Sequence, residues 1–392
     1  MKQRNQFLFV LGPHRSGTSL VASALHTLGV NLGDRFIDPN DDNPKGFFED
    51  EEIVRFNDRL LRSLSLSWDS FGFIWEEDFS AKRFKPYHKA AVTMIRDRFS
   101  NSSVSGLKDP RFCILLPFWK RVVSEALDVE VSYILGIRSP EQSVRSQRSR
   151  HIRDSDFHLL GRRNVQTLLL WWTYLHKALK EVDARHLLIV DYTSLVVAPE
   201  LELQRLAKLL GFDIPPDEAE SFSRQYVDPL LNRSQTPVKA AQRQDSSLWH
   251  YAQMLYERLH LLSRNDCIQP EDLQGVIEHI DVPQLEPLYL QELQYLYGYS
   301  YKKIISLRHR LIRSNQELGS EREKSGQLQE KCDTLIAQHE SLVDQHESLV
   351  DQYRLLAREH EVLSQNYQTV LNTKGWRLLV LLRRCVTWPF SR

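Results

Sequence analysis

Short apolar runs alternate with helical patterns along the first 235 residues, and this alternation limits the fold more than any other feature of the chain. The runs have the length and composition of strands that are buried on both faces of a parallel sheet. The predicted strands are residues 7–11, 131–137 and 187–190, and the predicted helices are residues 18–28, 141–150 and 200–210. The first and last of these helices are followed by glycine, a common helix stop. Strand–helix alternation predicts an α/β fold of three layers, with a parallel sheet between two layers of helices.

A loop with two glycines joins the first predicted strand to the first predicted helix. It reads Gly12-Pro-His-Arg-Ser-Gly17-Thr18-Ser19. Free backbone N–H groups in such a loop and the N-terminus of the following helix both favour an anion. The spacing is similar to that of the nucleotide P-loop, but Thr18 stands where that motif has the lysine that reaches the β and γ phosphates. The sequence therefore predicts a phosphate loop with Arg15 as its cation, and it argues against a nucleoside triphosphate.

A second phosphate-binding element is predicted at the end of strand 131–137. Arg138 follows this strand, and Ser139-Pro-Glu-Gln142 has the form of a capping box with proline at the first helical position. Ser146 follows about two turns into the helix. Taken alone, Arg138 is more typical of an ion pair. Beside the first loop, Arg138 and Ser146 are expected to converge on one phosphate.

The two elements together resemble the family of PAPS-dependent sulfotransferases, in which PAPS is 3′-phosphoadenylyl sulfate. Arg15-Ser16-Gly17-Thr18-Ser19 is similar to the family's 5′-phosphosulfate loop, and Arg138 with Ser146 is similar to its 3′-phosphate motif. Residues 43–50 and 107–111 look like segments of bacterial members. The pattern covers residues 5–235, and it implies a sheet of the P-loop nucleotide-binding type with PAPS as the sulfuryl donor. No metal is implied, because no carboxylate–serine pair for Mg²⁺ stands out.

The resemblance assigns two more residues to the nucleotide. Tyr192 lies in a segment, residues 190–211, that is similar to the strand–tyrosine–helix segment of the family, which implies that Tyr192 lies near the adenine. The family's glycine-rich loop R-K-G-x-x-G is not evident in this chain. Arg233, in Asn232-Arg233-Ser234, is expected to take over part of its role near the 3′-phosphate.

Sulfuryl transfer is expected to depend on positioning and charge stabilisation, by analogy with phosphoryl transfer. Arg15 would neutralise the leaving 5′-phosphate, and Lys108 would hold the sulfuryl oxygens. A surface salt bridge with Asp109 is an equal alternative for Lys108. Glu49 is the first choice for the general base that a hydroxyl acceptor needs, with Asp109 and His14 as rivals. The alternative for Glu49 is an acid at a helix N-terminus.

The remainder of the chain changes character after residue 300. Residues 301–372 lack proline and contain a duplicated heptad, Gln-His-Glu-Ser-Leu-Val-Asp. A seven-residue repeat of apolar side chains predicts a coiled coil and self-association, although polar companions at +4 leave a solvated single helix as the alternative. The repeating residues are Leu328, Leu335, Leu342, Leu349, Leu356, Leu363 and Val370. Residues 373–392 form a basic, aromatic tail, which suits an anionic membrane surface or a docking helix equally well.

Composition and cysteine spacing indicate which partners and which cellular compartment we expect for this protein. The chain has 51 Lys and Arg and 51 Asp and Glu, so the basic excess expected of a nucleic-acid binder is lacking. Its four cysteines lie far apart, which suits a reducing compartment rather than a disulfide framework or a zinc site. Neither a signal peptide nor a bilayer-spanning run is present in the sequence. The expected location is the cytoplasm, with peripheral contact at the inner membrane face.

The sequence leaves three functional hypotheses. The first is a sulfotransferase domain in residues 1–300 that moves the sulfuryl group of PAPS to a hydroxyl or amine acceptor, such as a saccharide or a lipid-linked glycan. The second is a nucleotide-dependent kinase of the P-loop class, which Thr18 disfavours. The third is an inactive P-loop-like domain on a coiled-coil scaffold.

Overall fold

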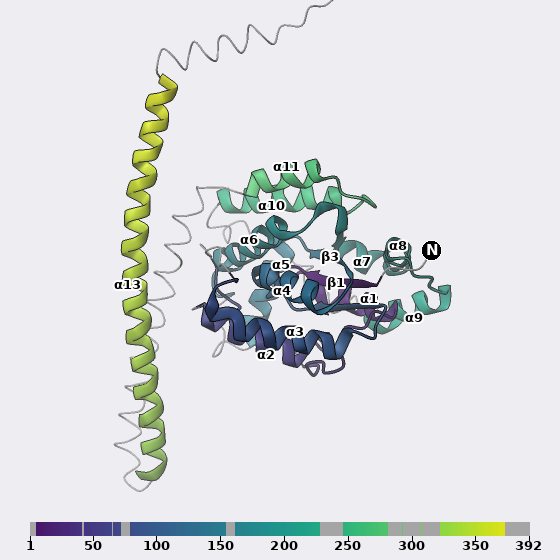
Figure 1. Ribbon diagram of the computed structural model, residues 1–392, viewed down its shortest axis with the longest axis horizontal. Helices are drawn as coiled ribbons and strands as arrows, with labels where there is room; N and C mark the ends of the chain where they lie inside the picture. Colours follow the sequence, from purple (N-terminus) through teal and green to yellow (C-terminus); the bar gives the residue numbers. More distant parts are fainter. Residues whose placement is uncertain are drawn as a thin grey trace, which may run out of the picture. The chain divides into compact units, whose positions relative to one another are not determined.

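The chain divides into two compact units, Met1–Leu296 and Tyr297–Arg392. The structure is a computed structural model, and it describes residues 5–40, 43–64, 66–71, 79–153, 161–227, 246–280, 292, 306 and 322–372. Figure 1 shows these parts of the chain in colour.

The first unit is built on a parallel β-sheet. Within the described residues the sheet has four strands in the order β2-β1-β3-β4. They are β1 (Gln6–Leu11), β2 (Val104–Lys108), β3 (Glu130–Ile137) and β4 (Leu187–Asp191). In register, Phe9 of β1 lies between Leu107 of β2 and Tyr133 of β3. Strand β2 therefore pairs with one edge of β1, and β3 pairs with the opposite edge. The strand order reverses at β1, which makes its carboxyl end a switch point of the sheet.

Helices cover both faces of the sheet. Alternate side chains of β1 point to opposite faces and pack into two separate clusters with these helices. Phe7, Phe9 and Leu11 belong to one buried cluster, which they share with α3, α4, α6, α10 and α11. Leu8 and Val10 belong to the other, which they share with α1, α8 and α9. Figure 1 shows these helices around the strands. Their bounds are α1 Thr18–Thr27, α2 Glu51–Ser63, α3 Lys85–Phe99, α4 Phe112–Ala126, α5 Pro140–Arg153, α6 Asn164–Glu181, α7 Tyr192–Val197, α8 Pro199–Leu210, α9 Pro216–Tyr226, α10 Ser246–Leu262 and α11 Pro270–Ile280.

The three-layer α/β prediction is confirmed, and each predicted strand and helix overlaps an observed one. Gly29 and Gly211 follow their helices with φ of 84° and 76°, the left-handed values that glycine allows at a helix end. The sequence did not predict β2 as a strand. Its sequence, Val-Ser-Gly-Leu-Lys, has no continuous apolar run, yet all five residues are buried.

The described part of the second unit is mainly one helix, α13 (Arg322–Asn372). This confirms a long helix in the region where the coiled coil is predicted. The leucines of the heptad repeat from Leu335 to Leu363 are 42–69 % exposed. Among the described residues, no helix combines the length and the apolar composition needed to cross a membrane. The predicted tail, residues 373–392, lies outside the described residues.

Candidate functional site

Most of the predicted site residues lie at the carboxyl ends of the four strands; Glu49, before α2, and Ser146, within α5, do not. The phosphate loop follows β1, Lys108 ends β2, Arg138 follows β3 and Tyr192 follows β4. Carboxyl ends of parallel strands share one edge of the sheet, and ligands of such sheets bind there. A pocket at this edge is lined by His14, Arg15, Gly17, Thr18, Ser19, Glu49, Lys108, Arg138, Ser146 and Tyr192, among others.

The phosphate loop is held in a conformation that depends on its glycines. Gly12 has φ of 145°, and a Cβ there would lie 2.5 Å from the carbonyl oxygen of Gly136 in β3. Gly17 has φ of 87°, and a Cβ there would lie 2.4 Å from Cδ2 of Tyr192. The two glycines therefore let the loop approach strand β3 and the Tyr192 ring more closely than any other residue would.

The phosphate loop has polar groups that are suited to binding an anion. Ser16 is fully buried, and its Oγ has no hydrogen-bond partner among the described residues. Gly17 is the N-cap of α1 and supplies no side-chain cap to the first turn. Buried polar atoms without partners are uncommon, and uncapped N–H groups at a helix start attract negative charge. These residues fit the phosphate end of a sulfonucleotide.

The two predicted phosphate elements lie in direct contact. Arg15 Nε donates a hydrogen bond of 2.9 Å to Ser146 Oγ. Arg138 Nη1 donates to the backbone carbonyl of Arg15 at 3.2 Å, and its Nε donates to Gln142 Oε1 at 3.1 Å. The Arg138 guanidinium also lies 4.0 Å from the centre of the Tyr192 ring. Burial lowers the pKa of Arg138 from its ordinary value.

Lys108 and Glu49 form an ion pair at the pocket, with side chains 2 % and 12 % exposed. Lys108 Nζ also donates to Ser19 Oγ at 3.2 Å. The alternative of a surface salt bridge between Lys108 and Asp109 is wrong, because Lys108 is buried and pairs with Glu49. Burial raises the pKa of the Glu49 carboxyl, while the positive charge of Lys108 opposes this shift.

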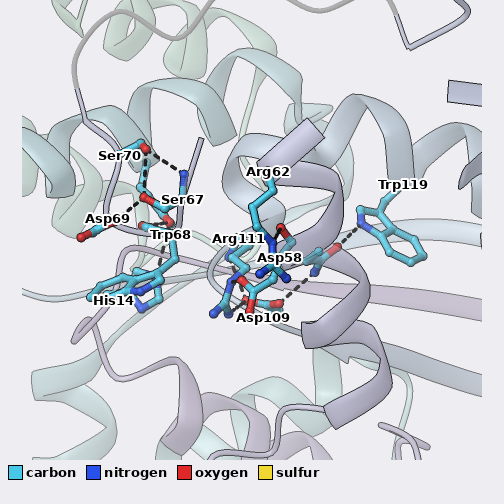
Figure 2. Close-up of polar contacts among 12 residues, drawn as sticks. His14, Asp58, Arg62, Ser67, Trp68, Asp69, Ser70, Asp109, Arg111 and Trp119 are labelled. Atoms are coloured by element: carbon cyan, nitrogen blue, oxygen red, sulfur yellow. Dashed lines mark hydrogen bonds and ion pairs between the residues drawn. The ribbon is translucent and has the colours of Figure 1, made fainter. Parts of the chain in front are cut away.

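Asp109 is occupied by a different set of donors. Its Oδ1 accepts from the backbone N–H of Arg111 at 2.9 Å and from Arg111 Nη1 at 3.0 Å. Its Oδ2 accepts from Asn57 Nδ2 at 2.8 Å, and the Asn57 amide oxygen in turn accepts from Trp119 Nε1. Figure 2 shows this network around Asp109 and Arg111, with Trp119 at its far end. A fully buried carboxylate with these partners suits a structural role rather than that of a general base.

The helix-capping role considered for Glu49 belongs to its neighbour Asp50. Asp50 is the N-cap of α2, and its Oδ1 accepts from the backbone N–H groups of Glu52 and Ile53 at 3.1 and 3.2 Å. Glu49 precedes this helix and lines the pocket. Its carboxylate is therefore available for interactions in the pocket rather than for the helix end.

His14 lies between two aromatic residues that the sequence did not assign to the site. Its ring centre is 4.8 Å from that of Trp68, shown beside it in Figure 2, and 5.3 Å from that of Tyr174. The Tyr174 hydroxyl donates to the backbone carbonyl of Trp68 at 2.5 Å and lies 3.3 Å from His14 Nε2. Nε2–H is therefore the donor in this contact, and Nδ1 carries the lone pair. Burial, followed by the charge of Arg111, lowers the pKa of His14 well below its ordinary value.

Two further residues support the phosphate loop without having been assigned to it. Asn43 Nδ2 donates to Ser19 Oγ at 3.1 Å, and Asn43 begins one of the segments compared with bacterial sulfotransferases. Cys113 Sγ accepts from the Gly12 N–H at 3.2 Å. No sequence pattern predicts that a lone cysteine will accept a hydrogen bond from a backbone N–H. Arg233 lies outside the described residues, and within the described ranges no group of three or more His, Cys, Asp and Glu could hold a metal ion.

Comparison with known proteins finds likeness only among solved structures. No family model matches the chain, and no curated protein matches its sequence. The sulfotransferase domain of the Synechococcus PCC 7002 olefin synthase is 16 % identical, with 72 % of this chain and 98 % of that chain covered and a TM-score of 0.34. The sulfotransferase domain from the curacin biosynthetic pathway is 14 % identical, with 70 % and 96 % covered and a TM-score of 0.33. Mouse sulfotransferase SULT7A1, complexed with PAP, is 11 % identical, with 73 % and 88 % covered and a TM-score of 0.30. At TM-scores below 0.5, the functional argument rests on this chain's own residues.

Proposed function

We propose that this protein is a sulfotransferase that moves the sulfuryl group of PAPS to a hydroxyl or amine acceptor. The observation that carries the proposal is the contact between the phosphate loop and the Arg138–Ser146 pair. Arg138 and Ser146 are distant from Arg15 in the sequence, yet each makes a hydrogen bond with Arg15. Two anion sites side by side match a nucleotide with a phosphate on each side of its ribose.

The loop residues would hold the 5′ end of the donor. Ser16 Oγ and the N–H groups at the start of α1 would donate to the 5′-phosphate, and the Arg15 guanidinium would neutralise charge that builds as this phosphate leaves. Arginine stays protonated at neutral pH, so its role is electrostatic rather than that of an acid. Ser146 uses a lone pair to accept from Arg15, which leaves its hydroxyl hydrogen for the 3′-phosphate.

PAPS would supply the sulfuryl group, whose bond to the 5′-phosphate oxygen breaks as the acceptor oxygen attacks sulfur. Lys108 has three N–H donors, of which Glu49 and Ser19 take two, and the third would contact a sulfuryl oxygen. The acceptor proton would pass to Glu49, whose raised pKa makes it a stronger base than an exposed carboxylate. His14 Nδ1 is the rival base at the same pocket.

The acceptor itself stays a prediction. The basic tail and the predicted coiled coil favour a saccharide or a lipid-linked glycan, with peripheral membrane contact. The tail lies outside the described residues. Cytoplasmic location and the absence of nucleic acid among the partners are likewise predictions from composition.

Calorimetry on the full-length protein tests the proposal. Adenosine 3′,5′-bisphosphate should bind without metal, more tightly than Mg-ATP, and Arg138→Ala should weaken it. Gln253→Ala, on the exposed side of α10, serves as a control and should leave binding unchanged. A preference for Mg-ATP would replace the proposal with a kinase, and absence of binding by both ligands would favour the inactive scaffold.

A further inference from the structure

Arg15 adopts a backbone conformation that its side chain disfavours. Its φ is 69°, in the left-handed region, which is sterically unfavourable for a residue with a Cβ. A backbone hydrogen bond from Ser16 N–H to the Pro13 carbonyl, 3.1 Å, closes a turn in which Arg15 holds the third position. Glycine is the usual residue for such a position. Some contact must therefore stabilise arginine there.

Arg138 makes that contact from outside the loop. Its Nη1 donates to the Arg15 carbonyl oxygen, so the hydrogen bond acts on the backbone of the strained residue. Arg138 is itself well fixed, since it is only 6 % exposed, donates to Gln142 and lies over the Tyr192 ring. A buried, fixed guanidinium is a strong donor to a carbonyl oxygen.

We infer that Arg138 is a positioning residue for the 5′-phosphate loop as well as a ligand of the 3′-phosphate. This inference rests on the proposed function and deepens it, because it couples the two anion sites of one nucleotide. The hydrogen bond of Ser146 is with the side chain of Arg15, whereas the hydrogen bond of Arg138 is with its backbone. The two members of the 3′-phosphate pair therefore affect the loop differently.

The inference separates ligands that carry a 3′-phosphate from ligands that lack one. Adenosine 5′-monophosphate presents only the 5′-phosphate. If Arg138 were a ligand of the 3′-phosphate and nothing more, Arg138→Ala would leave the affinity for this monophosphate unchanged. A loop that loses its backbone support should instead bind the monophosphate about tenfold more weakly, a change of 1.4 kcal/mol at 25 °C. Ser146→Ala is the matched comparison: it removes a contact to the Arg15 side chain but none to the Arg15 backbone, so it should weaken the monophosphate less than Arg138→Ala does.

A double-mutant cycle excludes an effect through the Tyr192 ring. Arg15→Gly places at the strained position a residue that adopts left-handed φ without cost. In that background Arg138→Ala should change the affinity for the monophosphate by less than twofold, because the loop no longer needs support. An effect that acts through Tyr192 would persist at its full size.

The inference is tested by calorimetric titration of the full-length wild-type protein and these variants with both nucleotides. Loss of monophosphate affinity in Arg138→Ala, and its disappearance in the Arg15→Gly background, would support the inference. Loss of bisphosphate affinity alone would overturn it and leave the proposed function standing. If the wild-type protein binds neither nucleotide, both the inference and the proposed function fail.

Discussion

Glu49 is a carboxylate whose surroundings act on its pKa in opposite directions. Burial raises the pKa above the ordinary 4.5, and the ion pair with Lys108 partly offsets that change. A general base must be deprotonated, so turnover should rise with pH through the raised pKa of Glu49. We expect the acid limb of the kcat profile to lie above pH 4.5, and a profile from pH 4.5 to 8 measures it.

The variant Glu49→Gln keeps the size of the side chain and removes the base. Turnover should fall by at least 100-fold, in line with the usual contribution of a general base, and calorimetric affinity for the bisphosphate should stay within about twofold. Unchanged turnover would reject Glu49 and move the role to His14. Asp58→Asn, which alters a half-buried partner of Arg111 that is not among the pocket-lining residues, is a control that should retain activity.

His14 should make folding stability depend on pH. Burial and the charge of Arg111 hold its pKa well below 6.5 in the folded protein, whereas the unfolded chain titrates near 6.5. As pH falls below 6.5, the unfolded state binds a proton that the folded state does not, so the free energy of unfolding decreases.

His14→Gln should reduce this decrease, by at most about 1.4 kcal/mol per pH unit relative to wild type. Urea unfolding between pH 7.5 and 5.5 measures both slopes. Equal slopes in wild type and variant would show that His14 is not held neutral by the fold.

At the level of elements, strand β2 shows where sequence patterns fall short. Strands β1, β3 and β4 are apolar runs, so their pattern predicts them. In β2 the central residue is Gly106, where a Cβ would lie 2.6 Å from the Leu8 carbonyl oxygen of the adjacent strand. The strand is specified by close contact with β1, and no local pattern encodes a contact between residues that are distant in sequence.

The same reasoning applies to the site. Arg15, Arg138 and Ser146 were predicted because each occupies a fixed place relative to a strand end or a helix start. Trp68 and Tyr174 follow no such rule, because they approach His14 from a loop and from the middle of α6. The partner of Lys108 was also beyond prediction, since the sequence suggests only the adjacent Asp109, whereas the fold brings Glu49 to Lys108 from a distant part of the chain.

Two glycines with opposite surroundings test the packing of β2. Gly106→Ala should destabilise the protein by about 1–3 kcal/mol, because the added methyl group would overlap the Leu8 carbonyl. In Gly275→Ala, in α11, the new Cβ would meet nothing within 4 Å, and the variant should gain about 0.5–1 kcal/mol. Urea unfolding measures both, and equal effects would contradict the packing described for β2.

At the level of the whole molecule, α13 presents an apolar row that the described residues do not cover. The leucines from Leu335 to Leu363 are exposed at every seventh residue over several turns. A helix of 51 residues is about 75 Å long and 10 Å wide, so one face offers roughly 750 Å². Two such faces together give about 1,500 Å², the size of a specific protein interface.

We propose that a second copy of this chain covers the row, since the heptad spacing on one helix matches the same spacing on another. Sedimentation of the full-length protein should then give twice the 46.0 kDa of one chain.

The double variant Leu342→Lys/Leu349→Lys should be monomeric, because it places charges in the apolar seam while keeping good helix formers. The matched control is Leu355→Lys/Val362→Lys, which changes two similarly exposed residues. Each lies one position before a leucine of the row, Leu356 or Leu363, and so about 100° round the helix from it, and this variant should remain dimeric. A wild-type mass of one chain, or an unchanged mass in the Leu342→Lys/Leu349→Lys variant, would reject pairing through this row. Bisphosphate affinity should be equal in all three proteins, because every site residue lies in the first unit.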